Sequence, residues 1–257
     1  MKSMKFSVSM FLLMVAISIT SCKKESSGSP TDDPACNGCE KISAVAANDS
    51  TAEGVYKGLL LSGTGVGHFR GSMLNGTGHN FFKMIFTRET YPVLNDTLRY
   101  AGNLQIGPSF TGNLHFVGSG SSVDIYMVGN TDFSSGDFTL SGGIGTGPKP
   151  QSILFKETST QQVKVYEGTM TGTGVWGVGK VGFVVQGNKI EGLITNSNNS
   201  LRESFWNGTL DADKKFSFSF TGNNSVYSGQ LTDDLNISGS FSIQGAAAGT
   251  FTATRTL

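Results

Sequence analysis

Few of the side chains that usually carry chemistry occur in this sequence. Its 257 residues include three histidines and three cysteines, namely His68, His79, His115, Cys22, Cys36 and Cys39. No G-x-S-x-G nucleophile elbow and no H-E-x-x-H zinc motif occurs. Paired carboxylates could still converge from distant strands, so a glycan-acting hydrolase remains an alternative. We nevertheless expect no catalytic residues, no metal and no cofactor, and therefore a protein that is not an enzyme.

Two short motifs resemble ligand-binding loops but have the wrong context. Residues 172–177 match the G-x-G-x-x-G pattern of nucleotide-binding proteins. That use requires a helix N-terminus after the loop, where the phosphate binds, whereas residues 178–186 alternate like a strand. We therefore interpret the segment as a glycine-rich hairpin loop. Residues 211–215 (Asp-Ala-Asp-Lys-Lys) follow another predicted strand and are interpreted as a polar turn rather than a calcium loop.

The histidines are not expected to share a metal. A two-residue hairpin turn at Asn75-Gly76 would place His68 opposite Lys83 and His79 opposite Ser72. The two histidines would then not be neighbours. We predict that they lie at the surface or at a barrel rim.

Cys36 and Cys39 form a C-x-x-C pair. In an exported chain such a pair most simply closes a small local disulfide. A redox role needs a helix N-terminus to lower the thiol pKa, and nothing helical follows here. We therefore predict a structural disulfide, with a pair that has no role as the alternative.

The first 21 residues have the parts of a secretory signal peptide. Lys2 and Lys5 precede an apolar run at residues 10–17, which is too short to cross a bilayer as a helix. Thr20 and Ser21 then precede Cys22, and this arrangement resembles the lipobox of bacterial lipoproteins. The resemblance implies cleavage before Cys22 and lipidation of Cys22 with acyl chains such as palmitate, which would anchor the chain to the membrane. An ordinary cleaved signal is the alternative.

Residues 22–50 are predicted to be a lipidated, flexible tether, because they contain too little apolar surface to fold. The charged residues after Cys22 loosely resemble the surface-export signals of Bacteroidetes lipoproteins. We therefore expect an outer-membrane lipoprotein that faces the periplasm or the cell surface. Asp49-Ser50-Thr51 and Asp96-Thr97-Leu98 resemble the O-glycosylation sequon of the same bacteria, and both are expected in a loop or in the tether.

Charge and composition narrow the partners and the fold class. Lys2 and Lys5 leave with the signal peptide, so 17 basic residues (19 minus 2) face 19 acidic ones, a net charge of −2. Nucleic-acid binding needs a basic excess or patch, so we exclude nucleic acid as a partner. Glycine is abundant, at 35 residues, and alternation punctuated by Gly, Asn and Asp dominates after the signal peptide. This pattern predicts an all-β chain.

The most informative pattern is an internal repeat, aromatic-x-Gly-x-Leu/Met, that begins at Tyr56, Phe69, Tyr100, Phe110, Tyr166, Trp206 and Tyr227. In a strand, the aromatic, the glycine and the Leu/Met share one face, which we expect to be buried. The other face is mostly polar and is expected to contact water. Leu59 and Ala101 are the exceptions.

Recurrent mid-strand glycines favour strongly curved, closed sheets in which an aromatic ring lies over the missing side chain. Turn signals divide the rest of the chain into about eight strands in each half, and Val55-Tyr56-Lys57-Gly58 recurs as Val165-Tyr166-Glu167-Gly168. We predict two tandem antiparallel eight-stranded meander or barrel modules, residues 51–161 and 162–257. One larger β-sandwich or barrel that spans both halves is the alternative.

Residues 237–251 carry Gly-x-Phe, then three alanines, then Gly-x-Phe. They are similar to the closing strands of lipid-anchored barrels of the transferrin-binding-protein type. The resemblance covers about fifteen residues and lacks the usual acidic residue after the alanines. It implies a barrel and does not imply iron transport.

These observations predict an envelope lipoprotein whose β modules bind a partner. The membrane is one partner, through the lipid on Cys22; the other is an unidentified small ligand, glycan or protein. Barrel mouths often hold ligands, and Trp176 and Trp206 are the predicted contacts. A structural or adhesive surface protein without a pocket is the main alternative.

Overall fold

The computed structural model describes residues 43–62, 65–76, 80–87, 94–100, 103, 105, 111–118, 121–128, 136–142, 151–173, 177–196, 202–220 and 224–257. All of these fall within the compact unit Asp33–Leu257. The predicted signal peptide, Cys22 and the Cys36–Cys39 pair lie outside the described residues. Within the described ranges, no helix has the length and apolar character needed to cross a bilayer.

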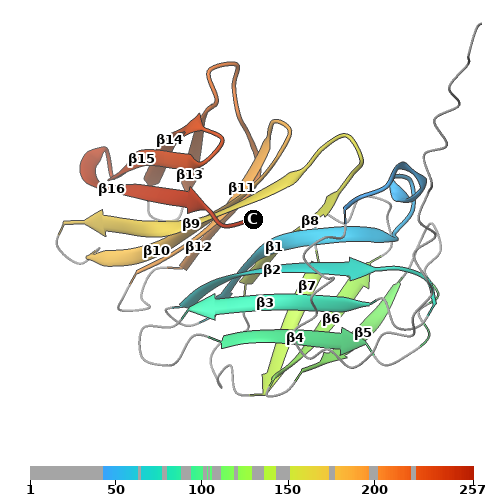
Figure 1. The fold of residues 1–257 in the computed structure, drawn as a ribbon. Helices are drawn as coiled ribbons and strands as arrows, with labels where there is room; N and C mark the ends of the chain where they lie inside the picture. The colour runs from blue at the N-terminus through green and yellow to red at the C-terminus, as the bar shows by residue number, and fades with distance from the viewer. Residues whose placement is uncertain are drawn as a thin grey trace, which may run out of the picture. The chain divides into compact units, whose positions relative to one another are not determined.

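The first half of the described chain forms one eight-stranded antiparallel sheet with the order β7-β6-β5-β4-β3-β2-β1-β8 (Figure 1). A short 3-10 helix, η2 (Ala46–Asn48), precedes it. Each strand from β1 to β7 pairs with the next, and β8 returns to pair with β1. The strands are β1 (Gly54–Ser62), β2 (Gly65–Met73), β3 (Phe81–Thr87), β4 (Leu94–Tyr100), β5 (Thr111–Val117), β6 (Ser121–Val128), β7 (Gly136–Gly142) and β8 (Gln151–Glu157).

The second half forms another eight-stranded antiparallel sheet, with the order β12-β11-β10-β9-β16-β15-β14-β13. Its first and last strands also pair with each other. The strands are β9 (Val163–Gly172), β10 (Val178–Gln186), β11 (Lys189–Asn196), β12 (Arg202–Thr209), β13 (Lys215–Phe220), β14 (Ser225–Asp233), β15 (Asn236–Ile243) and β16 (Ala246–Arg255). The predicted fold class, two tandem antiparallel eight-stranded modules, is therefore confirmed.

In each sheet one pair of strands that are consecutive along the chain is not hydrogen-bonded, and this gap in the pairing falls at a different place in each sheet. In the first sheet, the end strands of the order are β7 and β8; in the second they are β12 and β13. Aromatic side chains bridge the gap in the second sheet. Phe205 of β12 and Phe218 of β13 stack with their ring centroids 3.8 Å apart. Side-chain packing thus continues the second barrel across the point where strand pairing stops.

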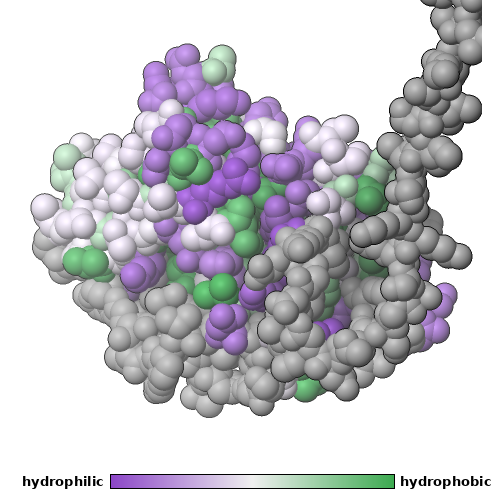
Figure 2. Space-filling view, in the orientation of Figure 1, coloured by the Kyte–Doolittle hydropathy of each residue, from purple (hydrophilic) through white to green (hydrophobic). Residues whose placement is uncertain are grey.

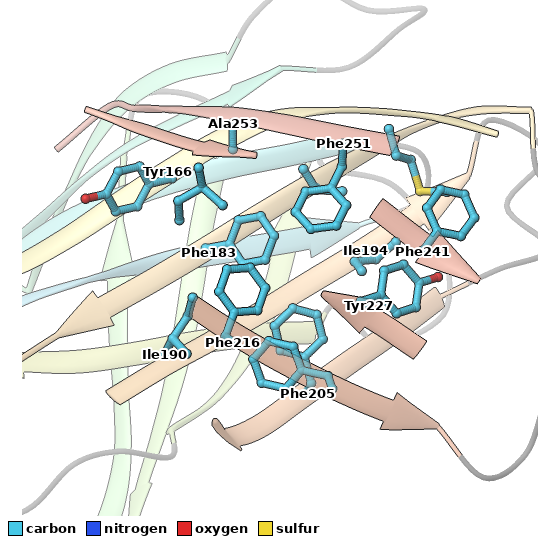
Figure 3. Close-up of a cluster of buried hydrophobic side chains, with 14 of the residues drawn as sticks. Tyr166, Phe183, Ile190, Ile194, Phe205, Phe216, Tyr227, Phe241, Phe251 and Ala253 are labelled. Atoms are coloured by element: carbon cyan, nitrogen blue, oxygen red, sulfur yellow. The ribbon is translucent and has the colours of Figure 1, made fainter. Parts of the chain in front are cut away.

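The repeated aromatic-x-Gly-x-Leu/Met face forms the cores of the two sheets. Tyr56, Leu60, Phe69 and Met73 belong to the buried cluster of the first sheet. Tyr166, Met170, Tyr227, Leu231 and others form the cluster of the second, part of which is drawn in Figure 3. In these four repeats the face that carries the aromatic and the Leu/Met is the buried one, as predicted.

Glycines in the repeat make room for rings from neighbouring strands. A Cβ placed on Gly71 would lie 2.2 Å from the ring of Phe82. A Cβ on Gly229 would lie 2.6 Å from the ring of Phe216. No side chain fits in so short a distance, so only glycine allows the ring to lie against the backbone.

The Trp206 repeat departs from the predicted alternation because β12 contains a bulge. The register between β11 and β12 shifts between Ile190 and Gly192, and Asn207 has φ 60°. The extra residue moves Phe205 opposite Gly192, and Phe205 is the aromatic that joins the buried cluster. The bulge therefore changes the alternation of this strand relative to the other repeats, and Phe205 lies in the core.

The prediction of one wet face holds for some strands and is wrong for β1. Strand β13 alternates between exposed and buried residues, and hydrophilic or neutral side chains predominate over β13–β15 in Figure 2. In β1, by contrast, Lys57 and Leu59 on the outward face are 8% and 0% exposed. Their burial has a tertiary cause, since this face packs against the second sheet.

An inter-sheet cluster of apolar side chains joins the outward faces of β1 and β8 to those of β9, β10 and β11. The two sheets approach each other closely at Gly182 of β10, where a Cβ would lie 2.7 Å from the side chain of Leu59. The buried members of the cluster are Leu59, Leu61, Val66, Ile153, Phe155, Val163, Val165, Val184 and Leu193.

The β2–β3 connection is longer than the predicted two-residue turn, so the predicted pairing is wrong. His68 lies opposite Ile85, and Arg70 lies opposite Lys83. Strand β2 ends at Met73 and β3 begins at Phe81, and the backbone N and Nδ2 of Asn75 donate to the Glu53 carboxylate at 2.8 and 2.7 Å. The register moves by two residues, which keeps every side chain on its predicted face.

Two further predicted loops can be compared with the structure. The sequon at residues 96–98 lies within β4, not in a loop, and Leu98 is buried. Asp49 accepts hydrogen bonds from Ser159 N at 2.9 Å and Ser159 Oγ at 2.5 Å, while Ser50 is exposed. The first sequon therefore presents an accessible hydroxyl, and the second is part of a strand.

Candidate functional site

Aromatic rings fill the interior of the second barrel. The ring centroid of Phe183 lies 5.8, 5.5 and 5.6 Å from those of Phe205, Phe216 and Phe251, respectively (Figure 3). In the first sheet, Phe82 packs against Phe116 with centroids 4.9 Å apart. Packing of this kind leaves little room for a ligand among these core residues.

A cavity of about 320 Å³ lies instead on the outward face of β2 and β3. Its volume is in the range of sites for small molecules. Two of the lining side chains, Arg70 and Lys83, carry a positive charge, and a third, His68, becomes positive when it is protonated. The others are mostly apolar. The lining residues are His68, Arg70, Phe81, Lys83, Ile85, Thr256 and Leu257.

Strand periodicity and register place the first five of these side chains on one face. His68 and Arg70 are two residues apart in β2, so both point outward, opposite to the buried Phe69. Phe81, Lys83 and Ile85 follow the same rule in β3. The antiparallel register then sets Arg70 directly beside Lys83.

Residues 256–257 supply the remaining wall. They continue beyond β16 and run along β9, because Thr256 N donates to Val165 O at 2.8 Å and Val165 N donates to Leu257 O at 3.1 Å. Leu257 also packs against the inter-sheet cluster. The cavity is thus lined by residues of both halves of the chain.

His68 is linked to the second sheet by a carboxylate. Its Nδ1 lies 2.9 Å from Glu167 Oε1 of β9, and the two side chains are 13% and 20% exposed. Because a carboxylate only accepts hydrogen bonds, Nδ1 carries the donated proton. In the neutral imidazole, Nε2 then holds the free lone pair.

Three cations lie in a row across adjacent strands. Lys57 of β1 is opposite Arg70, and Arg70 is opposite Lys83. Lys57 is neutralised by Glu157, with Nζ and Oε2 2.7 Å apart, and it also donates to Val163 O at 3.2 Å. Burial lowers the pKa of Lys57, and Glu157 opposes that effect. Arg70 and Lys83 line the cavity, and Lys57 is not among its lining residues.

The predicted contact residues, Trp176 and Trp206, fall outside the side chains that the structure describes. Trp176 lies outside the described residues, as does His79. Trp206 belongs to β12, but its side chain is not among those described. His115 is exposed on β5, and no group of three His, Cys, Asp or Glu that could hold a metal occurs in the described part of the chain.

Both loop interpretations agree with the structure. Residues 172–177 connect β9 to β10, with Gly172 N donating to Gly177 O at 2.6 Å. Residues 211–214 lie in the turn between β12 and β13, and Lys215, the first residue of β13, donates from its backbone N to Asp211 Oδ1 at 2.8 Å. The segment after residue 177 is a strand, as predicted, so the loop lacks the helix that a phosphate site needs.

From the sequence alone, Arg70 is predicted only to lie on a polar face, and the cavity is not predicted. The available signal was a histidine and an arginine two residues apart on the outward face of one strand. Their convergence with Phe81 and Lys83 depends on the register of β3.

The chain was also compared with known proteins. No protein-family model and no curated protein matches it. Matching solved structures include kievitone hydratase from Nectria haematococca, with 8% identity and a TM-score of 0.30, covering 86% of this chain and 95% of that chain. They also include a protein of unknown function from the DUF3598 family of Nostoc punctiforme, with 9% identity and a TM-score of 0.22, covering 79% and 95%. Both TM-scores are below 0.5, so neither similarity assigns this chain a family or an activity.

Proposed function

We propose that this chain is an envelope-anchored lipoprotein that binds a small anionic ligand in the cavity of β2, β3 and residues 256–257. The observation that carries the proposal is the pairing of Arg70 with Lys83 beside apolar walls. The guanidinium of Arg70 suits a carboxylate, sulfonate or phosphate, and the ammonium of Lys83 adds a second positive charge. Phe81 and Ile85 suit an apolar portion of the same molecule.

The binding proposal predicts saturable binding of 8-anilinonaphthalene-1-sulfonate, an anionic aromatic probe, with a rise in its fluorescence. Replacing Arg70 and Lys83 together with glutamine is expected to weaken binding about 100-fold. Each charged hydrogen bond contributes roughly 1.5 kcal/mol or more, which is about tenfold in affinity. Fluorescence titration measures the dissociation constant.

The matched control replaces two exposed lysines at the start of β13, Lys214 just before the strand and Lys215 at its first position, with glutamine. It changes the net charge by the same amount and should leave the affinity unchanged. If the Arg70/Lys83 variant bound the probe as tightly as the wild type, the cavity would not be the site. The structural or adhesive alternative would then gain support.

The anchor is supported by the N-terminal pattern of Lys2, Lys5, the apolar run and Cys22. Replacing Cys22 with serine is expected to move the protein from the membrane to the soluble fraction, because the acyl chains supply most of the membrane affinity. Cell fractionation with immunoblotting measures the shift, and Cys36→Ser is the control. A Cys22→Ser protein that stayed in the membrane fraction would exclude lipid anchoring.

A further inference from the structure

We propose that His68 and Glu167 form a general-base dyad, which removes a proton from a carbon acid bound in the cavity. Arg70 and Lys83 hold the anion that results. The proposal rests on the ligand cavity described above and adds an activity to it. It also departs from the expectation of a protein without catalysis.

The two ring nitrogens of His68 have different roles in the dyad. Nδ1 of His68 faces Glu167, at 2.9 Å, and Glu167 does not line the cavity whereas His68 does. The donated proton is therefore directed to β9, and Nε2 is the nitrogen left to accept a proton from a ligand. A carboxylate in this position fixes the tautomer and stabilises the imidazolium that forms.

Both members of the dyad are held by paired strands. Glu167 lies opposite Gly182 of β10 and Thr254 of β16. His68 lies opposite Leu59 of β1 and Ile85 of β3. Residues on paired strands are positioned more precisely than residues on loops, as a catalytic pair requires.

The surroundings of His68 favour charge development on a ligand. Arg70 is two residues away on the same face, and Lys83 lies opposite Arg70. The arrangement matches a base next to groups that stabilise a developing anion.

The step balances without a co-reactant. The Nε2 lone pair of His68 takes a proton from a carbon of the ligand, and the electrons of that C–H bond move into the ligand, onto an electronegative atom. Arg70 and Lys83 stabilise the negative charge there. The imidazolium of His68 is paired with Glu167 until the proton is returned or lost to water.

The probe 5-nitrobenzisoxazole tests this step directly. A base removes its ring C–H proton, the C–H electrons complete a C≡N bond, the N–O bond breaks, and the oxygen leaves as a coloured phenolate. We expect the wild-type protein to accelerate this reaction and His68→Gln to lower kcat by about 10²-fold or more. His115→Gln, at an exposed histidine of β5, is the matched control and should keep the full rate.

Glu167→Gln tests the positioning role. The amide oxygen can still accept a hydrogen bond from Nδ1–H of His68, but it carries no charge to stabilise the imidazolium. We therefore expect kcat to fall at least about tenfold while KM stays unchanged. Glu167→Asp should recover part of the loss. This split between kcat and KM would not result from a carboxylate that only joins the two sheets. Because Glu167→Gln does not change the histidine, it also tests the dyad if His68→Gln fails to fold.

Binding of 8-anilinonaphthalene-1-sulfonate distinguishes failure of the dyad from failure of the cavity. If the wild type bound this probe but eliminated 5-nitrobenzisoxazole no faster than His68→Gln, the dyad would be wrong and the cavity would stand. If the wild type bound no probe and catalysed nothing, both proposals would be overturned. Equal rates in the wild type and Glu167→Gln would remove Glu167 from the mechanism.

Discussion

Replacing Lys57 with methionine is expected to lower the free energy of unfolding by about 3–5 kcal/mol. Lys57 and Glu157 form an ion pair at 2.7 Å on the buried outward face of β1 and β8, and they are 8% and 7% exposed. Without Lys57, Glu157 remains a buried charge with its counterion removed. Urea denaturation followed by circular dichroism measures the loss.

The double variant Lys57→Met/Glu157→Leu should recover most of that stability, because no buried charge remains. The exposed pair Lys215–Asp213, 3.5 Å apart, supplies the control. Lys215→Met should change stability by about 0.5 kcal/mol or less. A Lys57→Met protein as stable as the wild type would show that water reaches Glu157 and that the sheets do not seal this face.

Glu191 is expected to make the fold less stable as the pH rises through neutrality. Burial raises the pKa of Glu191 from 4.5 to about 7, and a hydrogen bond from Asn207 N together with the charge of Lys189 opposes the rise. Below pH 4.5 the carboxyl is protonated in both the folded and the unfolded chain, so it has no effect on stability. Between pH 4.5 and 7 the unfolded chain ionises first, and stability falls by up to about 3 kcal/mol.

Glu191→Gln should remove this loss, because the amide oxygen can still accept from Asn207 N, as Glu191 Oε1 does at 3.4 Å. The variant is expected to match the wild type at pH 4.5 and to exceed it at pH 8 by about 3 kcal/mol. Thermal unfolding of both proteins across that range isolates the contribution of this residue from all others. Parallel stability curves for the wild type and Glu191→Gln would contradict the assignment.

The sequence was sufficient to predict the fold class because the pattern is local. Tyr56, Gly58 and Leu60 share a face by strand periodicity alone, and the same spacing recurs throughout both halves. The crowding at Gly71, where the ring of Phe82 takes the space of a side chain, is the contact that such a glycine predicts.

The outward surface was harder to predict, because its neighbours come from elsewhere in the chain. Leu59 interrupts the polar set of β1, and the structure shows that it contacts the second sheet, as does Leu61. Lys57 gave no such signal, since an outward lysine looks the same in a sequence whether water or another sheet covers it. Apolar residues on a nominally polar face were the available indication of an interface.

The cavity depends on two features that the spacing of residues in the sequence does not predict. The register of β2 with β3 follows from a connection in which Leu74 N donates to Asn80 Oδ1 at 2.6 Å, not from an Asn-Gly turn. The position of residues 256–257 against Val165 is a contact between the start and the end of the second sheet. Trp176 and Trp206 stay predictions that rest on the expectation of a ligand in a barrel mouth, whereas this cavity lies on an outer face.

Because the first and last strands of each sheet pair with each other, neither sheet can form all of its strand pairs until its last strand has been synthesised. The first barrel has all its strands once β8 has emerged at Glu157, whereas the second cannot pair β9 with β16 until residues 246–255 are made. Until β9, β10 and β11 have also emerged, Leu59 and Ile153 present an apolar surface without the side chains that cover it in the finished protein. The nascent chain therefore passes through a stage in which a finished barrel exposes its future interface, and this stage is the one most open to aggregation or to a chaperone.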